Sequence, residues 1–183
     1  GTAELPGVGS GTLHDERHFT IRSLQADGWW RIGARTLLQA GAEWRQQDGW
    51  YSYQDEAEFE LLFLTPGAPT SPTRTRSLTV EPSGHQAAAY LNWRLEPAAA
   101  FAADLGLRWD TESLAPDDDS HWSPRAVLMW RPREDTRLRL GWGRYYQAQA
   151  INELQVPDGE REYQRAQRAT HYVASAEHEL TSA

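Results

Sequence analysis

The stretch from Ala100 to Asp110 reads Ala-Phe-Ala-Ala-Asp-Leu-Gly-Leu-Arg-Trp-Asp, and it decides the expected fold. One set of alternate positions is apolar, namely Phe101, Ala103, Leu105, Leu107 and Trp109. The positions between them are mostly polar or small, namely Ala102, Asp104, Gly106, Arg108 and Asp110. A period of two residues is typical of a β-strand with one apolar and one polar face. The sequence therefore predicts a strand between an apolar and a polar environment.

The same alternation recurs along the chain. It is clear in Leu38–Trp44, Ala87–Leu95 and Arg137–Tyr145, and looser in Arg17–Trp30, Trp122–Trp130 and His171–Leu180. Together these segments predict seven strands, each of about ten residues, the length that spans a membrane as part of a barrel. No segment shows a sustained helical period. We therefore expect an all-β protein, an antiparallel up-and-down meander that forms part of a larger transmembrane β-barrel.

The connections between these strands alternate in length. Short turns are expected at Ile32–Arg35, Pro97–Ala99 and Pro132–Thr136, and long loops at Asp55–Gly84, Ser113–His121 and Ala148–Thr170. Gly1–Leu13, which contains Gly7, Gly9 and Gly11, is expected to be a flexible loop. Short turns on one side and long loops on the other are typical of membrane barrels, whose periplasmic turns are short and extracellular loops long.

Tryptophan is unusually abundant, at 9 of 183 residues. In an alternating meander, Trp30, Trp93 and Trp130 fall near the short turns, and Trp109 and Trp142 fall toward the long loops. Amphipathic rings gather at the two membrane interfaces, where they form aromatic belts. We therefore interpret these five residues as lipid-interface aromatics, and outer-membrane lipid as a partner of the chain.

The polar face is expected to line a lumen. Pairing Trp93 with Leu105 across the Pro97–Ala99 turn places Arg94 opposite Asp104, which predicts a cross-strand ion pair. The residues expected to face the lumen are Glu43, Arg94, Asp104, Arg108 and Arg139.

Composition excludes several functional classes. The chain has no Cys and no Lys, which removes thiol chemistry, Schiff bases and the Walker-A lysine. A net charge of −8 argues against a nucleic-acid partner. Two groups could suggest a metal site, the pair His14 and His18 and the run Asp117–Asp119. We expect both groups to be solvated and not to bind a metal. No catalytic set, metal or cofactor is expected.

A cluster of aromatic and amide side chains with one carboxylate lies where a strand enters the loop Ala148–Thr170. Its members are Tyr145, Tyr146, Gln147, Gln149, Asn152 and Glu153. Stacking and hydrogen bonding by such groups suit a small-molecule ligand. An aromatic belt followed by a loop-packing turn explains the same residues equally well.

Several motifs resemble the barrel of TonB-dependent outer-membrane receptors. They are Leu105-Gly-Leu-Arg-Trp-Asp110, Trp122-Ser-Pro-Arg-Ala-Val-Leu-Met-Trp-Arg-Pro132, Thr136-Arg-Leu-Arg-Leu-Gly-Trp-Gly-Arg-Tyr-Tyr-Gln-Ala-Gln149, Ile151-Asn-Glu-Leu-Gln-Val156, Ala166-Gln-Arg-Ala-Thr-His-Tyr172 and Ala176-Glu-His-Glu-Leu180. The resemblance implies a bacterial outer-membrane barrel of about 22 strands, occluded by a plug domain. It also implies import of a scarce small-molecule nutrient, such as a siderophore-like metal chelate, with energy from the TonB complex.

The chain departs from that family pattern in extent. It shows no plug, energy-coupling box or signal peptide, and about seven strands are too few to close a barrel. We therefore expect residues 1–183 to be an internal fragment of a barrel domain. Two alternatives are a soluble all-β module with a Trp-rich sugar-stacking surface and an outer-membrane enzyme on a small barrel. Loop-length asymmetry argues against the first, and the missing catalytic set against the second.

Overall fold

A computed structural model describes residues 2–5, 9–59, 73–116 and 119–180. The elements in chain order are β1 (Thr2–Leu5), β2 (Gly9–Arg31), β3 (Thr36–Phe59), β4 (Thr73–Val80), β5 (Ser83–Ala98), β6 (Phe101–Glu112), β7 (Asp119–Arg133), β8 (Thr136–Gln147), the 3₁₀ turn η1 (Val156–Asp158) and β9 (Gln167–His178). No helix in the described part of the chain is long and apolar enough to cross a membrane.

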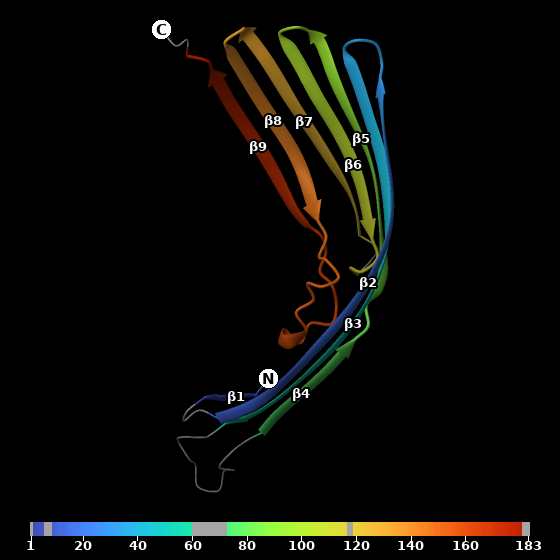
Figure 1. The fold of residues 1–183 in the computed structure, drawn as a ribbon, viewed down its shortest axis with the longest axis vertical. Coiled ribbons are helices and arrows are strands. Elements are labelled where there is room, and N and C mark those ends of the chain that lie inside the picture. The colour runs from blue at the N-terminus through green and yellow to red at the C-terminus, as the bar shows by residue number, and fades with distance from the viewer. Residues whose placement is uncertain (1, 6–8, 60–72, 117–118, 181–183) are drawn as a thin grey trace.

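The strands form one antiparallel sheet that curls into an open trough (Figure 1). The order is β1-β2-β3-β5-β6-β7-β8-β9, with β4 paired to the far part of β3. Each of the seven predicted strands is present, and most ends lie within four residues of the prediction. The exceptions are β2, which begins eight residues before Arg17, and β3, which ends 15 residues after Trp44. The short connections lie at 32–35, 99–100 and 134–135, close to the predicted turns. We call the end of the strands that carries these short connections the turn end, and the opposite end the loop end.

Two predicted loops are wrong where the structure describes them. Gly1–Leu13 contains β1 and the start of β2, and Asp55–Gly84 contains the last part of β3, all of β4 and the start of β5. The reason is that β2 and β3 stay paired from Arg31–Leu37 out to Gly9–Phe59. Where neither face meets an apolar environment, a hairpin needs no apolar face, so its backbone pairing continues without the hydrophobic alternation. Residues 1, 6–8 and 60–72 of these loops lie outside the described residues.

The other long loops are shorter than predicted. Strand β7 begins at Asp119 and β9 at Gln167, so part of Ser113–His121 and of Ala148–Thr170 is strand. The remaining segment 148–166, which we call the connector, lies inside the curve of the sheet (Figure 1).

The buried core of the described residues lies at the loop end, where the connector packs on the extended hairpin. Its members are Tyr51, Tyr53, Leu78, Ile151, Leu154, Val156 and Tyr163. The hydroxyl of Tyr163 donates to the carbonyl of Ile151 at 2.6 Å, and Tyr51 donates to the same oxygen. Arg76 of β4 donates to the carbonyl of Pro157. The connector is therefore a packed element that shares an apolar core with β3 and β4.

Candidate functional site

One face of the sheet is apolar and open. Register pairs Leu91 with Leu107, Trp93 with Leu105, and Leu128 with Leu140 on this face. Leu140 is 60% exposed and Trp122 58% exposed. An apolar surface that spans several strands is typical of a face that contacts lipid or another apolar partner.

The five tryptophans predicted to meet lipid lie on this apolar face. Trp30 and Trp130 are at or near the ends of β2 and β7, at the turn end, and Trp93 lies a few residues before the β5–β6 turn. Trp109 pairs with Trp122, and Trp142 with Tyr172, farther from the turns. The aromatic residues thus occupy two levels along the strands.

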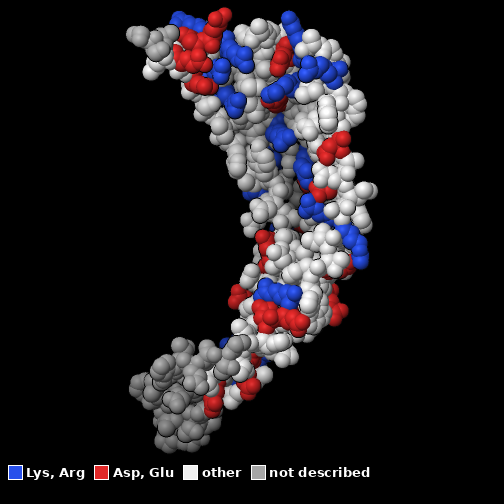
Figure 2. Space-filling view, viewed as in Figure 1, with Lys and Arg blue, Asp and Glu red and all other residues white. Residues whose placement is uncertain are grey.

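The opposite face is polar and lies inside the curve, since its residues share a pocket with Ala148 and Ala166 of the connector. The predicted pair forms here: Arg94 lies opposite Asp104, and its Nε and Nη2 donate to the two carboxylate oxygens at 2.8 and 2.9 Å. The guanidinium of Arg108 lies 2.7 Å from Asp110 Oδ1. On the side of the molecule seen in Figure 2, acidic and basic side chains are interspersed.

The remaining residues predicted for the lumen also lie on the polar face. Glu43 pairs with Arg45, its neighbour along β3. Arg139 is opposite Met129 and donates to its Sδ at 3.8 Å. All five predicted residues, Glu43, Arg94, Asp104, Arg108 and Arg139, therefore share one face.

A chain of hydrogen bonds crosses this face from β2 to β7. Tyr90 donates to Asp27, Gln39 donates to the Tyr90 hydroxyl at 3.4 Å, and Asn92 donates to Gln39 at 3.3 Å. Arg125 Nη2 donates to Asn92 Oδ1 at 2.6 Å. Arg125 reaches across β6 because position 106 is glycine: a Cβ there would lie 2.5 Å from Arg125 Nε and 2.8 Å from Asn92 Oδ1.

Replacing Gly106 with Ala is therefore expected to displace Arg125 and lower the free energy of unfolding by about 1–3 kcal/mol, the cost of breaking a hydrogen bond to a charged group. Gly141→Ala is the matched control, because a Cβ there meets its nearest atom at 3.7 Å. Denaturant titration of the full-length protein measures both variants. Equal loss of stability in the two would show that close approach at residue 106 is not the cause.

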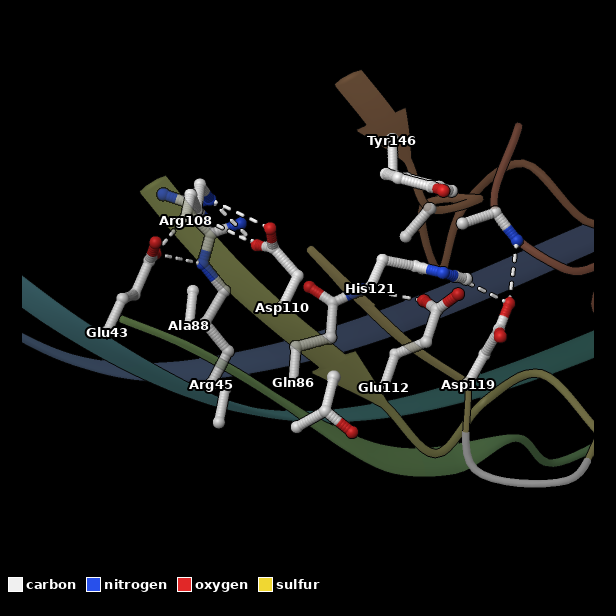
Figure 3. A pocket seen from close by; sticks show the side chains of 14 residues that line it. Glu43, Arg45, Gln86, Ala88, Arg108, Asp110, Glu112, Asp119, His121 and Tyr146 are labelled. Atoms are coloured by element: carbon white, nitrogen blue, oxygen red, sulfur yellow. Dashed lines mark hydrogen bonds and ion pairs between the residues drawn. The ribbon is translucent and has the colours of Figure 1, made fainter. Parts of the chain in front are cut away.

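A pocket of about 130 Å³ lies at the loop end of the polar face (Figure 3). It is lined by side chains of β3, β5, β6, β7 and β8, and the connector adds Ala148 and Ala166. His121 of β7 stacks on Tyr146 of β8 with ring centroids 4.2 Å apart and planes within 2°. The β7–β8 register ends at Arg125–Gly143, while β8 stays paired with β9, which leaves Tyr146 free to turn toward His121.

The carboxylates of Glu112 and Asp119 face each other in register in this pocket. Asp119 Oδ2 lies 2.9 Å from His121 Nε2 and accepts from the backbone N–H of Ala166 at 3.2 Å. Glu112, three residues beyond Trp109, is only 5% exposed. Burial raises the pKa of the Glu112 carboxyl, and the nearby charge of Asp119 adds to that rise.

The six residues predicted to bind a ligand have different surroundings. Tyr146 lines the pocket, and Tyr145 lines an adjoining cavity with Asn92 and Arg125. Gln149 and Glu153 hold the connector: Gln149 donates to the carbonyl of residue 153 at 3.1 Å, and Glu153 accepts from the N–H of residue 150 at 2.8 Å. Gln147 and Asn152 are exposed.

Sequence reasoning missed Glu112, Gln86 and His121, which lie at this pocket. The only available signal was their place on the polar face near strand ends. The two histidines predicted to be solvated, His14 and His18, are exposed on the outer part of β2, and each lies near Glu16, at 3.7 and 2.9 Å. Of the acidic run, only Asp119 is described.

Comparison with protein-family models matches residues 5–176 to "TonB dependent receptor-like, beta-barrel". Searches of curated proteins and of solved structures found no match. The matched range runs from the end of β1 almost to the end of β9, and so includes both faces described above. The chain therefore belongs to the TonB-dependent receptor β-barrel family.

Proposed function

We propose that this chain forms part of the wall of an outer-membrane receptor that binds a scarce nutrient, such as a siderophore-like metal chelate, and imports it with TonB-coupled energy. The family is one of outer-membrane transporters and receptors of Gram-negative bacteria, not of enzymes. In this proposal residues 1–183 are a partial barrel domain, and a plug domain and the TonB contact belong to other parts of the receptor.

The observation that carries the proposal is a two-faced sheet in a chain of this family. Its exposed apolar face suits lipid, with Trp30, Trp93, Trp109, Trp130 and Trp142 at the interfaces. Its polar face holds paired charges that suit a hydrated lumen around a plug. Such pairs contribute little to stability where they are exposed, about 0–1 kcal/mol, so we assign them a contact role.

The pocket and the neighbouring end of β8 would meet the nutrient from the outer side. Tyr145 and Tyr146 offer aromatic surfaces there, and the predicted set of Gln147, Gln149, Asn152 and Glu153 continues into the connector. In this proposal Gln149 and Glu153 act by holding the connector in place.

Uptake in cells tests the proposal. Deleting the gene for this chain is expected to lower uptake of one ferric chelate in a labelled panel by at least about tenfold. A protonophore is expected to stop that uptake while leaving surface binding intact, because binding needs no energy but transport does. Uptake that does not change on deletion across a panel of chelates and other scarce nutrients would contradict the proposal, as would uptake that persists with the protonophore.

A further inference from the structure

The pocket at the loop end holds more negative than positive groups. Its lining includes four carboxylates and two guanidinium groups, those of Glu43, Asp110, Glu112, Asp119, Arg45 and Arg108. Three of the carboxylates have partners: Glu43 pairs with Arg45, Asp110 with Arg108, and Asp119 with His121 and the N–H of Ala166. The fourth, Glu112, has no ion-pair partner among the described residues.

One carboxylate oxygen of Glu112 lacks a donor in spite of its burial. Its Oε2 accepts one long hydrogen bond, 3.4 Å, from Nε2 of Gln86. Its Oε1 is buried without a hydrogen-bond partner among the described residues, and its side chain lines the pocket, as Figure 3 shows. A buried carboxylate without a partner carries a desolvation cost that a cationic N–H donor would offset.

The surroundings favour an organic cation over a bare metal ion. Among the described residues, no group of three or more His, Asp or Glu side chains is arranged to hold a metal. The cavity of about 130 Å³ holds more than a single ion. Tyr146, stacked on His121, contributes an aromatic ring to the lining, and cations bind over such rings.

We propose that this pocket binds a protonated amine or a guanidinium group, with Glu112 Oε1 accepting its N–H. The inference rests on the proposed function, because it assigns the pocket to the outer side of a receptor. The cation belongs either to the imported molecule or to a Lys or Arg side chain from another part of the same receptor. Either source supplies the missing donor.

Calorimetry on the full-length receptor in lipid nanodiscs tests the first source, with n-butylammonium as the probe. We expect saturable binding that weakens at least tenfold in Glu112→Gln, because the amide loses the charge and keeps the shape. Glu177→Gln is the matched control, because this substitution removes the same charge outside the pocket. The Glu177 carboxylate lies 3.8 Å from the Arg137 guanidinium. 1-Butanol, which has the same chain without the charge, is expected not to bind.

A cryo-EM map of the same receptor distinguishes a cation supplied by one of the receptor's own side chains from a failure of the proposal. Absence of n-butylammonium binding, with a Lys or Arg nitrogen within hydrogen-bond distance of Glu112, supports a side chain as the cation. Absence of both overturns the proposal, and so does equal binding of the probe by the wild type and Glu112→Gln. These measurements need no energised membrane, so a failure of TonB-dependent uptake alone would refute the proposed function and leave this result standing.

Discussion

Replacing Leu105 with Arg will lower the ratio of folded to unfolded full-length protein in lipid vesicles by about 30- to 700-fold. Leu105 lies on the apolar face, 40% exposed, midway between the Phe101–Trp130 and Trp109–Trp122 pairs. A guanidinium on the lipid face at the bilayer midplane costs about 2–4 kcal/mol, and each 1.4 kcal/mol is a factor of ten. The folded fraction is measured by gel mobility with and without heating.

Two variants control this experiment. Asp104→Asn changes the adjacent residue on the polar face and breaks an exposed ion pair worth about 0–1 kcal/mol, so folding should be nearly unchanged. Leu140→Arg makes the same change on the apolar face of β8, where Leu140 is four residues after Thr136 just as Leu105 is four residues after Phe101, so its cost should be similar, about 2–4 kcal/mol. If Leu105→Arg and Asp104→Asn fold equally well, the assignment of faces is wrong.

Alternation predicted the strands wherever the two faces differ in environment. A one-residue shift moves every side chain to the other face, so the pattern determines register as well as position. The Arg94–Asp104 pair followed from that register, and its geometry is as expected. The outer halves of β2 and β3 have no such contrast, because polar residues occur on both faces. Their pairing is carried by the backbone, which leaves no periodic signal.

The pocket and the buried core depend on contacts between distant segments. Tyr51 meets Ile151 across 100 residues of sequence, and the pocket joins β3 to the connector. Composition near Ile151 suggested a loop, and nothing local shows that the loop folds back on β3. The six residues predicted to bind a ligand lie at the end of β8 and in the connector, and the contacts of Gln149 and Glu153 inside the connector depend on its tertiary fold.

Replacing Leu154 with Ala is expected to release the connector. Leu154 is 0% exposed and packs among Tyr51, Tyr163 and their neighbours. Removing a buried leucine side chain to the β-carbon costs about 2–5 kcal/mol, and here the loss falls on an element held by a small core. Hydrogen exchange of the full-length protein should show amides of 153–164 exchanging at least about 30-fold faster, with β5 and β6 unchanged.

The comparison with Asn152→Ala separates packing from loss of a polar surface group. Asn152 is exposed two residues away in the same connector, so its truncation should leave exchange unchanged. Tyr163→Phe should have a smaller effect than Leu154→Ala, about 1 kcal/mol, because Tyr51 still donates to the Ile151 carbonyl. If Leu154→Ala leaves the connector protected, its position must depend on the polar contacts of Arg76 and Asp119 rather than on the apolar core. The expected result, faster exchange in Leu154→Ala that is confined to the connector, would show that this element opens independently of the sheet. Its opening would uncover the pocket, because Ala148 and Ala166 of the connector line it.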